Sequence, residues 1–207
     1  MADLDGFLER LASGSPVPGG GSVAALHVAI GDALLCMVCE LTLGRPAYAS
    51  VEDDVEVIKG ASTVGMRRAR ELVDEDAAAF ERVSGAMKLP RTSDEEKSQR
   101  RRAMQESLKL AVQPPLETMR LAVDGVRESR RLVGIGNPAA ISDVACAALA
   151  FGAGFSSARL NVDINLASIK DEAFVESIRR ELAELPLVEG DVAAVVERAR
   201  EVIGAEA

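Results

Sequence analysis

Asp76 is the residue whose type and position most clearly suggest chemistry. It lies in a segment, residues 51–87, whose apolar side chains recur at spacings of three, four and seven, as along one face of a long helix. The slot four residues from both Leu72 and Phe80 holds Asp76, so its carboxylate is expected on the inward-facing side, whereas Asp74 should face elsewhere. Burying an unpaired carboxylate is costly, so Asp76 must be paired, protonated or used. A salt bridge to another helix and a catalytic role are both open.

A second candidate is the stretch Pro16-Val17-Pro18-Gly19-Gly20-Gly21-Ser22, which leads into an apolar helical segment, residues 22–43. Prolines restrict the backbone and glycines release it. Glycines at a helix N-terminus expose backbone N–H groups at the positive end of the helix dipole, which suits an anion or a flat polar ring. A flexible entry turn is the alternative. No Gly-Lys-Ser/Thr follows and no strand precedes the stretch, which excludes a P-loop and a dinucleotide-binding fingerprint.

Polar residues also interrupt a small-residue helical segment, residues 139–166. Asn161 and Asn165 are one turn apart, so their amides can grip one ligand together or bond to neighbouring helices. Asp143 lies near the same face, but 18 residues from Asn161 is about 27 Å along a straight helix. A kink, a long substrate or a symmetric dimer would be needed for both to reach one reactive centre.

The whole chain shows helical periodicity with almost no alternation, which predicts an all-α fold in a single domain, residues 1–207. We expect an up-and-down bundle of long helices with short flanking helices. Helices are predicted at about residues 4–11, 22–43, 51–87, 94–132 (interrupted at Pro114-Pro115), 139–166, 171–185 and 190–203. Ser93 and Glu96 form a capping box for the fourth helix. Gly44-Arg45-Pro46 breaks the second helix and leaves Arg45 and Tyr48 in a loop.

Composition excludes several classes of function. A net charge of −9 and 3% aromatic residues argue against nucleic-acid binding. No signal peptide and no clear membrane-length apolar run are found, so we expect a cytoplasmic, soluble protein without membrane contact. Cys36, Cys39 and Cys146 have apolar helical contexts typical of core cysteines. With His27 the single histidine, no zinc pattern is completed and no metal is expected.

Five short motifs occur in order between about Leu4 and Leu185. They are Pro16-Val17-Pro18-Gly19-Gly20-Gly21-Ser22, Leu41-Thr42-Leu43-Gly44-Arg45-Pro46-Ala47-Tyr48, Val73-Asp74-Glu75-Asp76-Ala77-Ala78-Ala79-Phe80, Gly136-Asn137-Pro138-Ala139-Ala140-Ile141-Ser142-Asp143 and Asn161-Val162-Asp163-Ile164-Asn165-Leu166. Together, in register, they resemble the cyclodeaminase/cyclohydrolase family of folate enzymes. That family includes the cyclodeaminase half of formimidoyltransferase-cyclodeaminase and free-standing bacterial methenyltetrahydrofolate cyclohydrolases.

The resemblance implies an all-helical homodimer that binds a tetrahydrofolate derivative as substrate in a cleft near the subunit interface. The acid/base would be a carboxylate of the Asp74-Glu75-Asp76 motif, and the helical pattern selects Asp76. Two features depart from the family: Arg45-Pro46-Ala47 stands where relatives often have lysines, and His27 replaces a residue that is usually small. These departures put recognition of a polyglutamate tail, or the identity of the substrate, in question.

The resulting hypothesis gives Asp76 the proton transfer and Asp143 the role of a second acid/base or pterin anchor. The residues expected to bind substrate are Pro18, Gly19, Gly20, Gly21, Ser22, Arg45, Tyr48, Asn137, Ser142, Asn161 and Asn165, with Arg45 meeting the glutamate carboxylate. The reaction expected is formimidoyltetrahydrofolate cyclodeamination. Methenyltetrahydrofolate cyclohydrolysis, a non-catalytic folate-binding or regulatory subunit, and a cyclase for another imine or amidine are the alternatives.

Overall fold

The computed structural model of the chain describes residues 4–205. The helices are α1 (Leu4–Leu11), α2 (Gly20–Thr42), η1 (Pro46–Val51), α3 (Glu52–Met87), α4 (Asp94–Ala111), α5 (Gln113–Ile135), η2 (Pro138–Ala140), α6 (Ile141–Leu166), α7 (Glu172–Glu184) and α8 (Glu189–Ala205), where η marks a 3₁₀ helix. No β-strand occurs in this described part. The predicted all-α fold class is confirmed.

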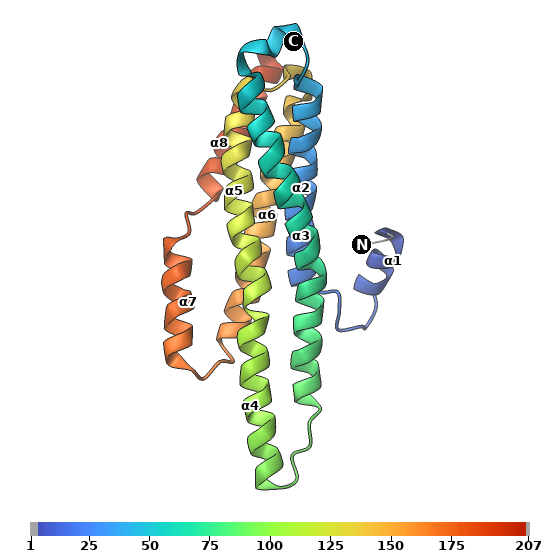
Figure 1. Ribbon diagram of the computed structural model, residues 1–207, viewed down its shortest axis with the longest axis vertical. Coiled ribbons are helices and arrows are strands. Elements are labelled where there is room, and N and C mark those ends of the chain that lie inside the picture. The colour runs from blue at the N-terminus through green and yellow to red at the C-terminus, as the bar shows by residue number, and fades with distance from the viewer. Residues whose placement is uncertain (1–3, 206–207) are drawn as a thin grey trace.

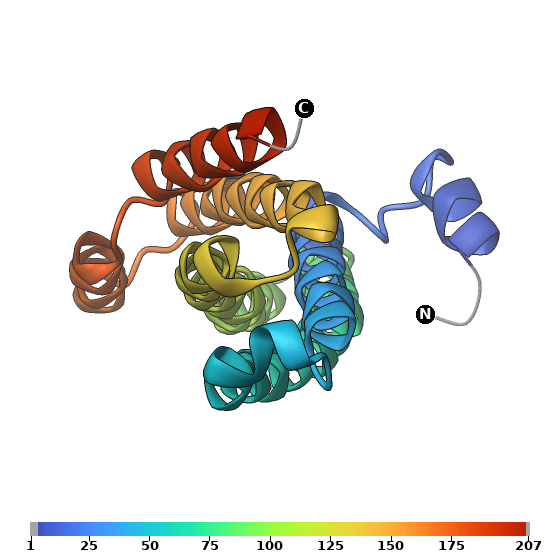
Figure 2. The same cartoon turned by 90° about the horizontal axis from the view of Figure 1, so that it is seen from above.

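The body of the molecule is an up-and-down bundle, in which α2, α3, the α4–α5 pair and α6 run along one long axis (Figure 1). Seen from above, α2, α3, α5 and α6 surround a common core, and α8 lies outside against α6 (Figure 2). Side chains that are completely buried, such as Leu35, Ile58, Leu116 and Phe151, fill that core. Gly31 and Gly125 leave room for the Phe151 ring, since a Cβ at Gly31 would lie 2.7 Å from it. The absence of side chains at these glycines lets α2, α5 and α6 pack closely.

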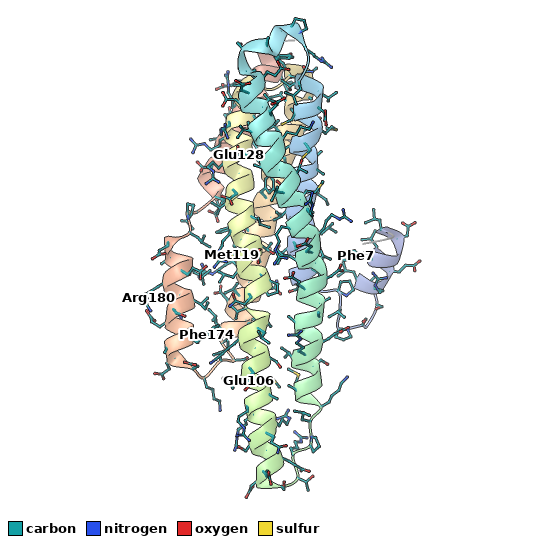
Figure 3. The ribbon with its side chains drawn as sticks, viewed as in Figure 1. Phe7, Glu106, Met119, Glu128, Phe174 and Arg180 are labelled. Carbon is teal, nitrogen blue, oxygen red and sulfur yellow. The ribbon has the colours of Figure 1, made fainter. Side chains whose placement is uncertain are left out.

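The short helix α1 is attached to the bundle by a single buried side chain. Phe7, which is 2% exposed, packs with Ala25 of α2 and with Leu72 and Val73 of α3 (Figure 3). The other large apolar residues of α1 are less covered, with Leu4 at 58% exposure. The helix therefore lies beside the long bundle without entering its main core (Figure 2).

The predicted helix boundaries agree closely with the structure because the signals that set them are local. The capping box is present: Glu96 N donates to Ser93 Oγ (3.2 Å) and Ser93 N donates to Glu96 Oε2 (3.0 Å). The Pro114-Pro115 pair falls in the first turn of α5, so the interruption is a restart after Ala111. Tyr48 differs from its prediction, since it lies within the 3₁₀ helix η1 and not in an irregular loop.

Three side chains assigned to apolar interior contexts are exposed. Phe80 and Met87 continue the apolar face of α3, yet they are 42% and 53% exposed. The reason is that Ser22, in the first turn of α2, lies opposite Val73 and Asp76, so the last turns of α3 extend past the end of α2. Cys146 is exposed on α6, whereas Cys39 is buried; all three cysteines are free thiols. The expectation of three core cysteines was therefore wrong for Cys146.

Two helices are long and apolar enough, by length and composition alone, to cross a membrane: Gly20–Thr42 and Pro138–Leu166. This differs from the prediction that no clear run of that length exists. In the bundle, 56% and 44% of these apolar windows are buried. Core helices of a bundle pass the same test, because a helix surrounded by others is apolar on most sides.

Candidate active site

A cavity of about 360 Å³ lies where the glycine-rich stretch meets the C-terminal half of α3. Its lining residues are Pro16, Val17, Gly19, Gly20, Gly21, Asp76, Phe80, Val83, Met87, Leu108, Ala111, Asn161, Ile164, Asn165 and Ser168. We call it the Asp76 cavity. It brings together three of the sequence motifs singled out above, from segments that are up to 149 residues apart between Pro16 and Asn165. Most of its wall is apolar, and a few polar groups converge on it, as in small-molecule sites.

Asp76 is held at the edge of this cavity by the first turn of α2. Ser22, fully buried, places its hydroxyl 2.9 Å from Asp76 Oδ2 and 3.1 Å from the carbonyl oxygen of Val73. Burial raises the pKa of the Asp76 carboxyl above its usual range, while hydrogen bonds from Ser22 lower it by a smaller amount. No ion pair to Asp76 is formed within residues 4–205, so the salt-bridge alternative is not what the structure adopts.

The glycines are required by the close approach of α2 to the carboxylate. A Cβ atom built on Gly21 would overlap Asp76 Oδ1, so only glycine fits there without movement of Asp76. A Cβ on Gly20 would come within 3.4 Å of the Asn161 amide nitrogen. The peptide bond between Val17 and Pro18 is cis, and Pro18 itself is partly buried beside the cavity wall. The positive end of the α2 dipole thus faces a side chain of the protein, Asp76.

Both late asparagines line the cavity and also make structural hydrogen bonds. Asn161 Nδ2 donates to the carbonyl oxygen of Ser157 (2.8 Å), one turn earlier in α6. Asn165 Nδ2 donates to the carbonyl oxygen of Ala111 at the end of α4 (2.9 Å). Asn161 and Asn165 therefore both line the cavity and bond to the backbone of the bundle, so the two predicted roles are compatible. Each amide is anchored through its nitrogen, which leaves its carbonyl oxygen as an acceptor near the cavity.

Nine lining residues were not among the predicted site residues, and most of them are apolar, including Val17, Phe80, Met87, Leu108 and Ile164. Their types are ordinary core types, so composition gave no signal. A signal did exist for Phe80 and Met87: they lie four and eleven residues after Asp76 on the same apolar face. The apolar face of α3 that contains Asp76 thus continues through Phe80 and Met87 as one wall of the Asp76 cavity.

The remaining predicted residues lie at the opposite end of the bundle. Asn137 is 6% exposed, and it is held by four hydrogen bonds besides the one that its backbone carbonyl accepts from Ala140 N. Its backbone N donates to Thr42 Oγ1, its Nδ2 donates to the Leu41 carbonyl, and its Oδ1 accepts from Ala139 N and from the Tyr48 hydroxyl. Asn137 thus fastens the start of α6 to the C-terminal end of α2.

Arg45 and Ser142 are exposed near Asn137, and Asp143 is half-buried in the first turn of α6. The length of α2, Gly20–Thr42, puts this group about 33 Å from the glycines. Within one chain, therefore, the Asp76 cavity is far from a second group of predicted residues, which are Arg45, Tyr48, Asn137, Ser142 and Asp143.

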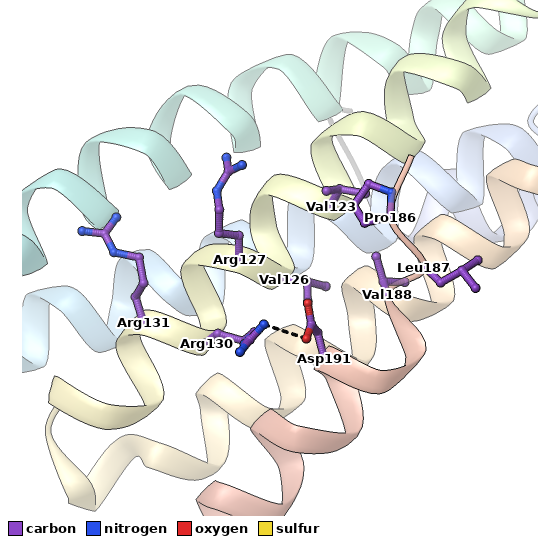
Figure 4. A pocket seen from close by; sticks show the side chains of 9 residues that line it. All are labelled: Val123, Val126, Arg127, Arg130, Arg131, Pro186, Leu187, Val188 and Asp191. Atoms are coloured by element: carbon purple, nitrogen blue, oxygen red, sulfur yellow. Dashed lines mark hydrogen bonds and ion pairs between the residues drawn. The ribbon is translucent and has the colours of Figure 1, made fainter. Parts of the chain in front are cut away.

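A second hollow, of about 450 Å³, contains three arginines of α5 but offers no free positive charge. Arg130 is paired with Asp191 of α8 at 2.7 Å, whereas Arg127 and Arg131 extend from α5 toward α3 (Figure 4). Arg127 is paired with Asp124, and Arg131 with Glu128 and Asp54. Guanidinium groups that are already matched by carboxylates make this a poorer anion site than its arginine content indicates.

The sequence was compared with known protein families and with individual proteins. The model of the formiminotransferase-cyclodeaminase family matches residues 3–184. The chain belongs to this family. It is 39% identical over 182 residues to a methenyltetrahydrofolate cyclohydrolase of Methylorubrum extorquens, with 88% of each chain covered. It is 35% identical to the formimidoyltransferase-cyclodeaminase of Rattus norvegicus, but it spans only 34% of that longer protein.

A solved structure supports the family assignment at the level of the fold. The crystal structure of a formiminotetrahydrofolate cyclodeaminase from Thermotoga maritima superposes with a TM-score of 0.81 at 30% identity, covering 98% of this chain and 96% of that one. The relatives are folate-processing enzymes of two kinds, cyclohydrolases and cyclodeaminases. The predicted resemblance is confirmed.

The arrangement around Asp76 is suited to proton transfer. A carboxyl group whose pKa is raised by burial, in a cavity with apolar walls, keeps its proton to higher pH than an exposed carboxyl does and can deliver it to a departing group. Within residues 4–205 no group of three or more His, Cys, Asp or Glu side chains is placed to hold a metal ion.

Proposed function

We propose that the protein is a formimidoyltetrahydrofolate cyclodeaminase that works at the bridge between N5 and N10 of tetrahydrofolate. The observation that supports this reaction most directly is the Asp76 carboxyl, which burial keeps protonated to higher pH than usual at the edge of the cavity. Cyclodeamination needs an acid, because ammonia leaves well only when its nitrogen has been protonated. Family membership supports the folate substrate class.

In this mechanism the cavity holds N10 close to the carbon of the protonated formimidoyl group on N5, and N10 attacks that carbon, which leaves an NH2 group on the tetrahedral intermediate. The Asp76 carboxyl gives its proton to the amino group of the tetrahedral intermediate, and the bond from carbon to that nitrogen breaks to release ammonia. Asp76 then takes the proton from N10 as the methenyl bridge forms, so the carboxyl returns to its starting state. Ser22 stabilises the ionised form in between, through the hydroxyl 2.9 Å from Oδ2.

Cyclohydrolysis of 5,10-methenyltetrahydrofolate is the second candidate. It is favoured by the 39% identity to a cyclohydrolase that matches this chain over 88% of both sequences. In that reaction the ionised Asp76 would take a proton from the water that attacks the bridging carbon. It would give that proton to N5 as the bond between N5 and the carbon breaks and the hydroxyl proton is released, which yields 10-formyltetrahydrofolate.

The glutamate end of the folate would extend toward a basic hollow that adjoins the Asp76 cavity. This hollow, of about 340 Å³, shares Met87, Leu108 and Ser168 with the cavity and also contains Arg100, Arg101 and Lys170. These side chains are an alternative to Arg45, which lies at the far end of the same chain. If the tail lies here, Arg101→Ala should raise KM for folate substrates more than Arg45→Ala does.

We propose further that a second copy of the chain completes the site, as the family resemblance suggests. An exposed apolar face runs along α2 and α6 and contains Ile30, Met37, Leu41, Leu160 and Ile164, at 38–71% exposure. Ile164 also lines the Asp76 cavity, so the face and the cavity are continuous. A twofold axis across this face would place the partner subunit's Asp143 and Asn137 beside the Asp76 cavity. The two groups of predicted residues, which are about 33 Å apart within one chain, would then meet across the interface.

A parallel assay with formimidoyl- and methenyltetrahydrofolate tests the proposed reaction, by following the absorbance of the methenyl compound. Cyclodeamination makes the absorbance rise and cyclohydrolysis makes it fall. Asp76→Asn should lower turnover by about 10²–10⁴-fold, since that is the usual contribution of a positioned acid or base, with folate binding retained. Tight folate binding without turnover by the unmodified protein would instead mean a binding or regulatory subunit. Unchanged turnover in Asp76→Asn would remove Asp76 from the mechanism.

A further inference from the structure

A second buried carboxylate, Asp32 of α2, lies about 16 Å along the helix from Gly21 and takes no part in the proposed reaction. It is 4% exposed and has no hydrogen bond or ion pair with any residue between 4 and 205. It lines a hollow of about 400 Å³ together with residues of α3 and α5. An unpaired buried carboxylate is costly, so its retention beside a hollow calls for a partner.

The hollow is a slot between α3 and α5, and along these two helices an ion pair lies beyond the lining residues in each direction. At one end Arg131 of α5 binds Asp54 of α3 (3.1 Å), and at the other Arg68 of α3 binds Glu117 of α5 (2.7 Å). Between these pairs the facing side chains are small or short, from Gly60, Ala61, Val64 and Gly65 on α3 and from Leu121, Asp124 and Gly125 on α5. We call this hollow the Asp32 slot.

The floor of the slot has two buried polar groups without partners. Ser62, 2% exposed, has a hydroxyl oxygen that makes no hydrogen bond to any described residue, and it lines the same hollow as Asp32. Gly65 makes room for the carboxylate, since a Cβ atom there would lie 2.6 Å from Asp32 Oδ2. Buried polar groups normally have a partner, so a buried hydroxyl without one beside the unpaired Asp32 carboxylate indicates a ligand that supplies hydrogen-bond donors.

The charges around the slot favour a cation as that ligand. All the charged groups that share the slot with Asp32 come from α5: Asp124, Arg127 and Glu128. Arg127 is paired with Asp124, and Glu128 with Arg131, so the described residues that line the slot leave no positive charge for Asp32. Burial and the nearby Asp124 raise the pKa of Asp32 to about 8. A cation in the slot would offset both effects.

We infer that the Asp32 slot binds a small protonated primary amine. Its ammonium group would donate hydrogen bonds to the Asp32 carboxylate and to the Ser62 hydroxyl oxygen, and its carbon chain would lie against Val64 and Leu121. A metal ion fits less well, because within residues 4–205 no three His, Cys, Asp or Glu side chains gather at one point. A quaternary ammonium ion lacks the N–H donors that both floor atoms need.

Calorimetric titration of the full-length protein with ethylammonium chloride tests this inference, at about pH 9, where a carboxyl of pKa about 8 is mostly ionised. Tetramethylammonium chloride and potassium chloride at equal ionic strength are the comparison salts. We expect saturable binding of ethylammonium only, weakened about ten- to a hundredfold in Asp32→Asn, the range that a charge-assisted hydrogen bond provides. At about pH 7 binding should release close to one proton, measured from heats in buffers of different ionisation enthalpy.

A pair of glycine variants on α3 provides the matched control. Gly65→Ala would put a methyl group into the space of the Asp32 carboxylate, whereas Gly85→Ala on the same helix has nothing within 4 Å. Amine binding should be lost in the first and unchanged in the second. The inference is overturned if no amine binds saturably, if tetramethylammonium or potassium binds equally well, or if Asp32→Asn binds ethylammonium like the unmodified protein. The test needs no folate, so it is independent of the proposed reaction.

Discussion

Asp76 and Asp32 are both carboxyls whose pKa is raised by burial, but their surroundings differ in two respects. Asp76 has the Ser22 hydroxyl at 2.9 Å, which lowers its pKa, whereas Asp32 has no such donor and has the like charge of Asp124 nearby. A donor stabilises the ionised form and lets a carboxyl change state during a reaction. A buried carboxyl without a hydrogen-bond donor lowers the stability of the folded protein.

Ser22→Ala is expected to raise the pKa of Asp76 further, because it removes the hydroxyl that stabilises the ionised carboxylate. The pH dependence of kcat/KM then shows which role Asp76 has. If Asp76 is the acid of a cyclodeaminase, the fall in rate at high pH should move to higher pH. If it is the base of a cyclohydrolase, the rise at low pH should move upward instead. A profile that does not move in either reaction would contradict a role for Asp76.

Asp32→Asn is expected to stabilise the protein increasingly as the pH rises. The folded state keeps the Asp32 proton up to about pH 8, whereas the unfolded chain loses it near 3.8, so between these values the folded state binds more protons. The free energy of unfolding therefore falls with rising pH in this window. The gain from Asp32→Asn should grow by a few kcal/mol from about pH 4 to 8 and then stay constant. Urea unfolding at fixed protein concentration and without added amines measures it.

The control for that experiment is Asp53→Asn, at an exposed aspartate in the first turn of α3. Its effect on the free energy of unfolding should stay within about 0.5 kcal/mol, as for most surface changes. A difference between the unmodified protein and Asp32→Asn that is independent of pH would show that the Asp32 proton is not linked to folding.

At the scale of elements, the site depends on where α2 begins and on how far α3 extends past that point. The first turn of α2 abuts Asp76, and α3 extends beyond it with Phe80 and Met87 uncovered. The end of a helix supplies both the backbone N–H groups and the open space, whereas a continuous helix pair would have buried the same apolar face. The glycines matter because they remove the side chains from this junction.

Gly21→Ala should reduce turnover by about a hundredfold or more, because its methyl group would displace the Asp76 carboxylate and a shift of about 1 Å can have that effect. Gly85→Ala, in open space on α3, should leave turnover unchanged and stabilise the helix by about 0.5–1 kcal/mol. Steady-state kinetics and thermal unfolding of the two variants check this. Equal activities would mean that the junction has room for a side chain.

At the scale of the whole molecule, the predicted residues form two groups at opposite ends of one bundle. The Asp76 cavity has the glycines and the late asparagines, and the far end has Tyr48, Asn137 and Asp143. The exposed apolar face of α2 and α6 lies between the two groups. If two copies associate across it, each site takes one group from each chain.

Mixing two inactive variants tests that arrangement. Asp76→Asn and Asp143→Asn should each be inactive, but a mixed dimer would have one site with both carboxylates and one with neither. Random re-association of equal amounts should therefore recover about a quarter of the unmodified activity. Light scattering confirms the dimer. No recovery from two inactive variants that do re-associate would place both residues in the same chain's site.

Much of this structure could be predicted from local signals in the sequence. Helix boundaries followed from the capping box at Ser93, the prolines of α5 and the glycines at the start of α2, since each acts within one turn of the backbone. The direction of Asp76 followed from helical periodicity, which fixes how a side chain points around its own axis. The family was predicted from five short motifs that occur in the family's order along the chain.

Tertiary structure alone decided what lies opposite each side chain. Periodicity placed Phe80 and Met87 on an apolar face, but their exposure depends on α2 beginning at Gly20. It could not single out Asp32, because α2 is apolar nearly all round and no face of it is distinguished. Only the packing of α3 and α5 puts Gly65, Ser62 and Asp124 around that carboxylate. A sequence determines the direction of a side chain within its helix, and the neighbouring helices determine whether that direction leads to core, cavity or water.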